Sequence, residues 1–148
     1  MLREGGGHAV VYDERSVVVE VWTPNESIVT GIDERFEEGT ARIVSALRSL
    51  GLEPEVGALP GEYCAGGHSV HLGGIKVAGT AQRIRRGSAL FAAVVLVGGG
   101  DLIRAALADI YAALDLSWDP STAGAIQDLA PHVTPDSVES ALRAAFGE

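Results

Sequence analysis

The chain has 148 residues, of which 47% are hydrophobic and 21% charged, and its formal net charge is −9 at pH 7. This size and composition predict a single soluble globular domain with a sizeable core. The acid excess argues against nucleic acid as a partner, because an acidic surface repels phosphate backbones. No apolar run approaches the ~18 residues that cross a bilayer, so no membrane anchor is expected.

One cysteine, Cys64, and one lysine, Lys76, stand out in this composition, because every other basic residue is an arginine. A single cysteine cannot form an internal disulfide, which favours a reducing cytoplasm. Acid excess with arginine in place of lysine is a halophilic composition, typical of adaptation to high salt. Lysine is a compact point charge and arginine a wide planar fork, so the one retained lysine is a candidate for a specific role.

The chain is predicted to open with a β-hairpin followed by an α-helix. Residues 8–12 and 16–22 are β-branched and apolar, and residues 13–15 between them supply a turn. Residues 31–50 are typical of an amphipathic helix, because apolar residues recur at spacings of three, four and seven. Gly51 is a suitable stop for this helix.

The middle of the chain is predicted to contain a loop between short strands. Residues 53–58 form a short strand, and residues 59–67 are rich in proline and glycine and form a loop. Residues 68–72 and 76–85 indicate a second hairpin, with Gly73-Gly74 as its tight turn.

The last third of the chain is predicted to hold a buried strand and two helices. Residues 88–98 are almost continuously apolar, so this strand is central in a sheet. Thr134 and Pro135 cap and begin the final helix. The inward-facing residues are expected to be Leu102, Ala106, Ile110 and Leu114 in the first helix and Val138, Leu142 and Phe146 in the second. Without clean βαβ alternation, this order predicts an α+β domain with a mixed, largely antiparallel sheet and a helical C-terminal tail over about 119–148.

The candidate chemistry lies in the loop that holds Cys64. A lone cysteine is usually a small buried hydrophobe, but this one sits in a glycine-rich loop that a substrate can approach closely. Lys76 lies near the closed end of the second predicted hairpin, whereas the Cys64 loop enters at the open end. Contact between them requires the loop to fold back or the lysine stem to reach along the hairpin. An ammonium close to the thiol would favour the thiolate and stabilise an oxyanion.

The histidines near Cys64 do not indicate a metal site. His68 and His71 are three positions apart on one predicted strand, so they point to opposite faces and at most one can face the thiol. The spacing of the histidines and the one cysteine matches no zinc-ligand pattern, and no metal is expected. Gly79, inside a predicted strand, indicates either a bulge or close approach of a ligand to the backbone.

Two segments taken together resemble the lipoate–protein ligase and octanoyltransferase family, which is related to the biotin ligases. These are "REGGGHAV" at the start and "GIKVAGTAQR" over 74–83, and they occur in the family's order. The segment "EYCAGGHSV" resembles the cysteine loop of the octanoyl-[H protein]:protein N-octanoyltransferase branch. The resemblance implies the α+β fold of biotin and lipoate ligase catalytic domains.

The resemblance also implies a role for each matching residue. Cys64 would be the nucleophile that carries the acyl group as a thioester, and Lys76 would contact the acyl carbonyl. The acyl-binding tunnel would be lined by Arg3, Gly5, Gly6 and Gly7, with Gly79 and Ala81 opposite. The transferase route needs no cofactor, whereas the ligases of the family use ATP and Mg²⁺ to form an acyl-adenylate. Lys76 suits either route, and Cys64 suits only the transferase.

Three departures from the family pattern matter. Ala65 stands where the related loop usually has proline, and the strand over 88–97 lacks the His-Gly that is common in ligases. Family catalytic domains usually carry several dozen residues before the Arg-Gly-Gly-Gly segment. The chain is therefore expected to be an N-terminally shortened domain, from a misplaced start or a decayed copy, or one half of a split enzyme with a separate N-terminal partner chain.

Three functions follow from these observations. The first is an acyltransferase of lipoate metabolism that moves octanoyl or lipoyl through Cys64 to a lysine of a lipoyl-domain protein. The glycine-cleavage H protein and the 2-oxoacid dehydrogenase acyltransferase subunits are the expected partners. The second is an ATP-dependent lipoate–protein ligase. The third is a non-catalytic subunit or remnant that binds acyl groups or lipoyl domains.

Overall fold

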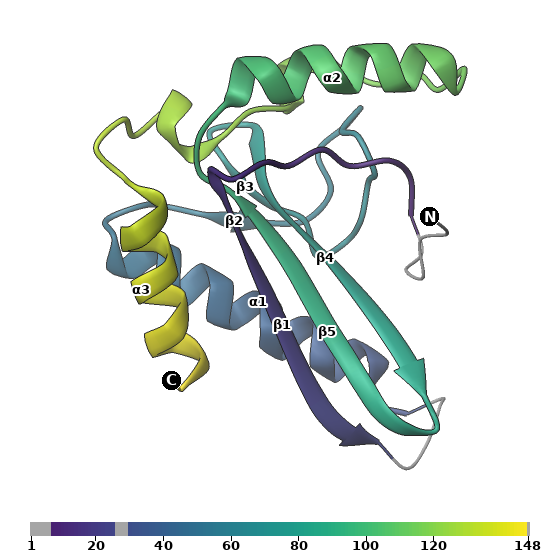
Figure 1. Cartoon of the computed structure of the whole chain (residues 1–148), viewed down its shortest axis with the longest axis vertical. Coiled ribbons are helices and arrows are strands. Elements are labelled where there is room, and N and C mark those ends of the chain that lie inside the picture. The colour runs from purple at the N-terminus through teal and green to yellow at the C-terminus, as the bar shows by residue number, and fades with distance from the viewer. Residues whose placement is uncertain (1–6, 26–29, 148) are drawn as a thin grey trace.

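The computed structural model describes residues 7–25 and 30–147, which form one antiparallel sheet with helices around it (Figure 1). The strands stand in the order β1-β5-β4-β3-β2, and each neighbouring pair is antiparallel. The strands are β1 (Ser16–Asn25), β2 (Glu55–Val56), β3 (Val70–Leu72), β4 (Ile75–Arg85) and β5 (Gly87–Leu96). The helices are α1 (Ile32–Ser49), α2 (Gly100–Ala113) and α3 (Pro135–Phe146), with short 3₁₀ turns η1 (Pro120–Thr122) and η2 (Ile126–Asp128). The expected α+β class with a largely antiparallel sheet is confirmed.

The predicted N-terminal hairpin is wrong, because β1 pairs with β5 and not with residues 8–12. The pairing extends along the whole of β1, from Ser16 opposite Leu96 to Asn25 opposite Gly87. Residues 9–13 form no strand and instead cross the end of the sheet below α2 (Figure 1). The long apolar strand β5 offers a far larger pairing surface than a five-residue neighbour, so the non-local pairing is preferred.

The second predicted hairpin is confirmed in β3 and β4. Its two turn residues, Gly73 and Gly74, have φ angles of 52° and 81°. Two successive positive φ angles are the requirement of a type I′ turn, whose twist matches that of the strands. Leu72 therefore pairs with Ile75 and His71 with Lys76, which fixes Lys76 one residue from the turn.

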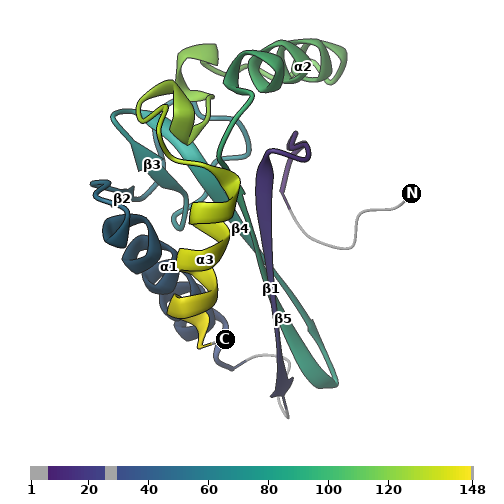
Figure 2. The ribbon, with the colours of Figure 1, turned by 60° about the vertical axis from the view of Figure 1, so that its left-hand side comes forward.

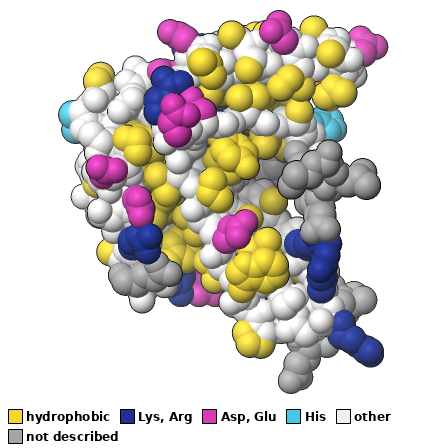
Figure 3. All heavy atoms as spheres, viewed as in Figure 1, with side chains coloured by type: hydrophobic (Ala, Val, Ile, Leu, Met, Phe, Trp, Pro, Cys, Tyr) yellow, Lys and Arg dark blue, Asp and Glu magenta, His cyan; other side chains and the backbone are white. Residues whose placement is uncertain are grey.

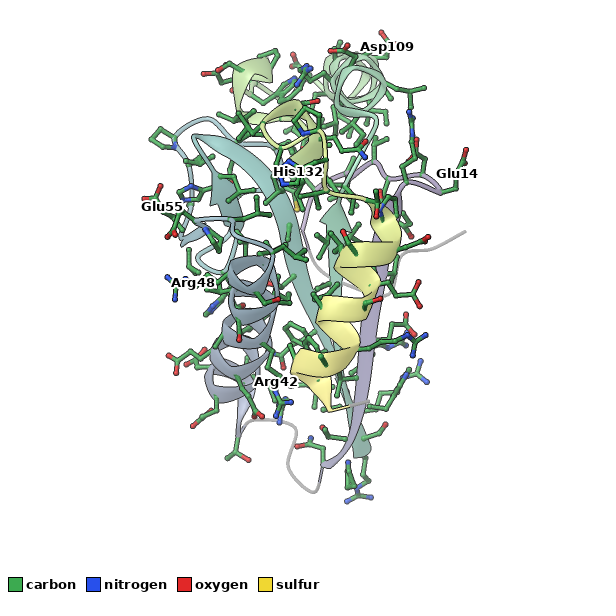
Figure 4. The ribbon with its side chains drawn as sticks, turned by 90° about the vertical axis from the view of Figure 1, so that its left-hand side faces the viewer. Glu14, Arg42, Arg48, Glu55, Asp109 and His132 are labelled. Carbon is green, nitrogen blue, oxygen red and sulfur yellow. The ribbon has the colours of Figure 1, made fainter. Side chains whose placement is uncertain are left out.

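One face of the sheet is covered by α1 and α3, which lie side by side on it (Figure 2). Val17, Val19 and Val21 of β1 point to this face and pack against its core. The fully buried members of that core include Ile43, Leu47, Val70, Val77, Val95, Val97, Ile126 and Val138. Between the two helices, Arg42 of α1 donates to the Ala145 carbonyl of α3 and lies 5.6 Å from the Phe146 ring centre (Figure 4).

The C-terminal helix begins as the sequence predicts. The Thr134 hydroxyl accepts a hydrogen bond from the Ser137 N–H, and Pro135 occupies the first helical turn. Both features satisfy or remove backbone donors that a helix leaves unpaired at its start. Val138 and Leu142 are buried and Phe146 is partly buried, as expected.

The prediction for the buried face of α2 is wrong. The expected inward residues Leu102 and Leu114 are exposed, and Ala106 and Ile110 are only partly buried. The buried residues are Ile103, Leu107 and Tyr111, which follow the same four-residue spacing one position further along the chain. They form a second core with Tyr63, Leu96, Ala123 and Ala125. In the described part of the chain, no helix is both long enough and apolar enough to cross a membrane.

Candidate functional site

Lys76 is buried against the loop that carries Cys64. Its side chain is 3% exposed, and its Nζ donates hydrogen bonds to the carbonyl oxygens of Tyr63 at 3.0 Å and Cys64 at 2.8 Å. The ammonium also lies 4.8 Å from the centre of the Tyr63 ring, within the range of a cation–π contact. The loop therefore folds back over the β3–β4 hairpin, which the sequence left open as one way for the two residues to meet.

Glu62 is a buried carboxylate in the same loop, and its side chain is wholly inaccessible to solvent. Its Oε1 accepts hydrogen bonds from the Gly66 N–H at 3.0 Å and from the Ser69 hydroxyl at 2.7 Å. The same oxygen lies 3.7 Å from Lys76 Nζ. Its burial could not be predicted from the sequence, because a glutamate beside a glycine in a loop follows no periodic pattern that marks it as buried.

Opposing effects act on the proton affinity of the Lys76 amine. Burial lowers the pKa of Lys76 below its usual value of 10.5, and the charges of Glu62 and Cys64 raise it again in part. Burial also raises the pKa of Tyr63 above its usual range, with the Glu62 charge acting in the same direction. Both effects arise because a charged form loses hydration inside the protein.

Cys64 is held by its backbone, with its side chain half-buried. Its φ angle is 44°, in the left-handed region that residues other than glycine seldom adopt. Its N–H donates to the Tyr111 hydroxyl at 2.8 Å, and that hydroxyl donates to the Ala9 carbonyl at 3.2 Å. Tyr111 thus ties the Cys64 loop, α2 and the N-terminal segment together. The predicted inward face of α2 did not include this residue.

The segment after α2 packs against the other side of the loop. The Trp118 ring meets Tyr63 edge-on at 6.3 Å between ring centres and lies 5.5 Å from that of Tyr111. The Asp119 N–H donates to the Gly61 carbonyl at 2.7 Å. Gly61 has a φ of 78°, and a Cβ there would lie 2.9 Å from the Asp119 Cβ, so this contact requires glycine.

Gly79 and Ala81 lie on the sheet face opposite α1. The register places Gly79 beside Val94 and Ala81 beside Ala92, in rows that continue to Val18 and Glu20 of β1. A Cβ added at Gly79 would lie 3.6 Å from the Lys76 Cε, so this glycine borders the lysine stem. Figure 3 views this face and shows hydrophobic side chains exposed on it below α2.

The remaining predicted tunnel residues lie at the N-terminus. Arg3, Gly5 and Gly6 are outside the described residues. Gly7 is described and exposed, with a φ of 97°, two positions before the Ala9 that bonds to Tyr111. The structure thus brings Cys64, Lys76 and Gly79 into one region and leaves the placement of the Arg-Gly-Gly-Gly segment a prediction.

The two histidines near Cys64 have different surroundings. The His68 ring stacks on Phe36 of α1 with 4.8 Å between ring centres, and His71 Nδ1 lies 4.0 Å from a Glu55 carboxylate oxygen. Within residues 7–25 and 30–147, no three His, Cys, Asp or Glu side chains are grouped to hold a metal ion. The reactive groups gathered at the loop are the Cys64 thiol, the Lys76 ammonium and the buried Glu62 carboxylate.

A groove of about 540 Å³ lies on the opposite side of the Cys64 loop, between α1 and residues 56–68. Val44, Arg48 and Val56 line it, together with Thr40, whose buried hydroxyl has no hydrogen-bond partner. It contacts the loop only through Gly67 and His68. We therefore place the candidate site at Cys64 and Lys76 and not in this groove.

Known proteins support a family assignment. The family model of the lipoyl protein ligase A/B catalytic domain matches residues 1–147. The octanoyl-[GcvH]:protein N-octanoyltransferase of Geobacillus kaustophilus is 32% identical over 107 residues, which are 72% of this chain and 38% of that protein. The enzyme of the same name from Bacillus velezensis is 34% identical over 87 residues, 59% of this chain and 30% of that protein.

Solved structures have the same fold. Lipoate-protein ligase A bound with ATP superposes with a TM-score of 0.76 at 24% identity, covering 97% of this chain and 56% of the ligase. A bi-partite lipoate protein ligase from Thermoplasma acidophilum, reported with its E2 lipoyl domain, gives a TM-score of 0.71 at 25% identity and covers 97% and 55%. The chain spans between about a third and just over half the length of these relatives. By its match along nearly the whole sequence, the chain belongs to the lipoyl protein ligase A/B catalytic domain family.

Proposed function

We propose that this protein transfers octanoyl or lipoyl groups between lipoyl-domain proteins through a thioester on Cys64. The observation that carries the proposal is the Lys76 ammonium, which lies 2.8 Å from the Cys64 carbonyl at the base of the loop. A buried cation at the backbone of the lone cysteine supplies the two components of acyl transfer, a nucleophile and a stabiliser of the oxyanion. The curated relatives named above are transferases with octanoylated GcvH in their names.

The proposed reaction has two balanced steps. In the first, the Cys64 thiolate attacks the acyl carbonyl of the donor amide, an S–C bond forms, the C–N bond breaks, and the leaving lysine amine takes up a proton. In the second, the neutral amine of the acceptor lysine attacks the thioester, a C–N bond forms, the C–S bond breaks and the thiolate leaves. The acceptor nitrogen releases one proton to water, which balances the proton that the donor amine takes up from water in the first step. Lys76 stabilises the oxyanion in both steps by donating a hydrogen bond from its ammonium.

The acyl chain is proposed to extend from Cys64 over the open face of the sheet. Gly79 and Ala81 give this face small side chains beside Lys76, where a thin alkyl chain can lie against the backbone. The Arg3-to-Gly7 segment is proposed as the opposite wall. Lipoyl-domain proteins, with the glycine-cleavage H protein as acyl donor, are the proposed partners.

The second candidate function is an ATP-dependent lipoate–protein ligase, in which Cys64 is incidental. Lys76 favours this route as much as the first, since contact with the acyl carbonyl does not require a thiol. Lys76 itself is poorly placed to contact a nucleotide, because its ammonium is buried and already donates to two carbonyl oxygens. This environment suits a carbonyl group better than a triphosphate, and no step through ATP and Mg²⁺ is derived.

Intact-mass measurement after incubation with octanoylated H protein tests the first function. We expect an adduct of one octanoyl group that hydroxylamine removes and that Cys64→Ser abolishes. Ser69→Cys in the Cys64→Ser background is a matched control, because it restores a thiol to the same loop at the wrong place and should not restore the adduct. Lys76→Met should leave the thiol present but slow adduct formation by roughly a hundredfold.

Two other outcomes would overturn the transferase proposal. Acyl transfer that requires ATP and survives Cys64→Ser indicates the ligase. No adduct and no transfer, with and without a candidate partner chain, indicates a non-catalytic protein that binds acyl groups or lipoyl domains. In that case isothermal titration with an octanoylated lipoyl domain would still detect binding.

A further inference from the structure

Glu62 is a charged group that the proposed reaction does not use, although it is the most deeply buried acidic side chain of the loop. Its side chain is wholly inaccessible, and its Oε2 has no hydrogen-bond partner. A buried carboxylate with one unpaired oxygen is costly, and such a group is kept where it has a counter-charge and a purpose. The nearest cation is Lys76, at 3.7 Å from the other oxygen.

The contacts of Glu62 close the loop on both sides of Cys64. The carboxylate belongs to the residue two positions before the cysteine, and it accepts hydrogen bonds from Gly66, two positions after it, and from Ser69, directly before β3. One oxygen therefore gathers residues 62–69 into a closed turn. The same oxygen faces the ammonium that holds the carbonyls of Tyr63 and Cys64.

We propose that Glu62 is the positioning residue of this site: its buried carboxylate closes the Cys64 loop and keeps the Lys76 side chain charged where the acyl carbonyl is polarised. Only the polarisation of the acyl carbonyl rests on the proposed function. The closure of the loop and the charge on Lys76 are properties of the folded chain itself.

The electrostatic argument follows from burial. Lys76 is 2% exposed as a residue, so its ammonium loses most of its hydration, which favours the neutral amine. A neutral amine is a weak hydrogen-bond donor and stabilises an oxyanion poorly. The groups around Lys76 that can carry charge are Glu62, Tyr63 and Cys64 from the loop and His71, which faces it across the β3–β4 register. Of these, Glu62 is the one with a carboxylate and has the largest effect in favour of the charged amine, with Cys64 acting in the same direction.

The composition of the chain allows a direct test, because Lys76 is the only lysine. Protein made with ¹³C-lysine gives one side-chain Cε–Hε signal, and its chemical shift followed against pH reports the titration of this one amine. Glu62→Gln keeps an oxygen that can accept from Gly66 and Ser69 but removes the charge. We expect the midpoint of the Lys76 titration to move to lower pH in this variant.

Two variants complete this test. Ser69→Ala removes a donor to the same carboxylate and leaves its charge in place, so its midpoint should stay close to that of the unaltered protein. Glu62→Asp retains a carboxylate and should recover part of the shift. An unchanged midpoint in Glu62→Gln would overturn the proposal, and so would an equal shift in Ser69→Ala.

The contribution to acyl transfer is measured separately. With octanoylated H protein, Glu62→Gln should slow adduct formation by on the order of tenfold, with loss of activity beginning at lower pH, and Glu62→Asp should restore part of the rate. A shifted midpoint with an unaltered rate of adduct formation would overturn the link to catalysis. If the unaltered protein forms no adduct, the proposed function fails, whereas the lysine titration still decides whether Glu62 holds the charge.

A stability measurement covers the case in which Glu62→Gln is folded but too unstable for the titration. Removing one member of a buried pair leaves an uncompensated charge, so Glu62→Gln combined with Lys76→Met should be more stable than Glu62→Gln alone. Thermal unfolding of the two single variants and the double variant checks this. A double variant no more stable than the less stable single variant would overturn the proposed pairing.

Discussion

The two faces of the sheet differ in how much of them is covered and in what they carry. The face under α1 and α3 is closed by a core of apolar side chains that includes Ile43, Leu47 and Val95. The other face is covered at one end by α2 and the Cys64 loop, and along β1 it leaves Val18 and Trp22 exposed at 49% and 60%. Every group of the candidate site lies on this second side or in the loop at its end.

Within a single strand, one residue can contribute to the closed core and its neighbour to the candidate site. Because side chains alternate across a strand, neighbouring positions of β1 belong to different faces, and so do Lys76 and Val77 of β4. Val77 of β4 is fully buried in the closed core, and Lys76 beside it joins the candidate site. Substitutions one residue apart should therefore affect different properties of the protein.

The largest effect is expected in the closed core. Leu47→Ala removes a fully buried side chain from α1 and should lower the free energy of unfolding by about 3 kcal/mol. Urea denaturation measures this. Leu102→Ala, on the exposed face of α2, is the matched control and should change stability by less than about 0.5 kcal/mol. Equal losses in the two variants would contradict the assignment of the core.

A smaller effect is expected where α1 meets the sheet most closely. A Cβ added at Gly39 would lie 2.3 Å from the Phe91 ring, and that ring is buried. The crowding should outweigh the helix propensity gained by alanine, so Gly39→Ala should destabilise by about 1–2 kcal/mol. At Gly67 a Cβ would meet nothing within 4 Å, and Gly67→Ala is the control. A gain in melting temperature for Gly39→Ala would refute the close contact.

The support of the site can be tested at Tyr111. Tyr111→Phe removes the hydroxyl between the Cys64 N–H and the Ala9 carbonyl, so stability should fall by about 1 kcal/mol. The amide of Cys64 should exchange with deuterium faster, and iodoacetamide should alkylate the single thiol faster. Tyr12→Phe, at an exposed tyrosine, should change none of these rates. Unaltered exchange in Tyr111→Phe would mean that the hydroxyl does not hold the loop.

The buried lysine should be visible in the pH dependence of stability. The pKa of Lys76 is lowered in the folded protein, so below its usual value of 10.5 the unfolded chain binds more protons than the folded chain. The free energy of unfolding should therefore rise with pH from the lowered value up to about 10.5. Lys76→Met removes this contribution, and thermal unfolding between pH 8 and 10 should show a smaller rise. Equal slopes would contradict the burial of a charged amine.

The smallest effect is expected at Val18, on the open face of β1, and its neighbour Val19 on the closed face is the comparison. Val18→Thr, at an exposed position, should change stability by less than about 0.5 kcal/mol. Val19→Thr places a hydroxyl against the closed core and should cost about 1 kcal/mol. The difference in stability between these two variants measures the contrast between the faces directly. Equal stabilities would show that the two faces do not differ at these positions.

Local signals in the sequence were sufficient for the elements whose cause is local. The Gly73-Gly74 turn, the Thr134 cap with Pro135 and the amphipathic pattern of α1 each depend on residues within one or two turns. The partner of β1 could not be predicted in this way. β5 lies some 70 residues further along the chain, and the nearer segment had the same β-branched composition.

The site was only partly predictable for a related reason. Cys64 and Lys76 stood out by composition and by the family motif, but their contact depends on a loop that no periodicity describes. α2 has apolar residues on several sides, so two sets of residues with the same four-residue spacing were candidates for its buried face. The set that includes Tyr111 is the one that is buried. Glu62 went unnoticed because burial of a carboxylate is decided by its partners Gly66, Ser69 and Lys76 and not by its own neighbours in sequence.

The burial of the one lysine has a consequence for self-acylation during the proposed transfer. A transferase that passes acyl groups to lysine amines risks acylating its own surface. This chain carries no other lysine, and the amine of Lys76 is withdrawn beneath the loop. If the proposed thioester forms, no lysine side chain on the protein's own exterior competes with the acceptor for it.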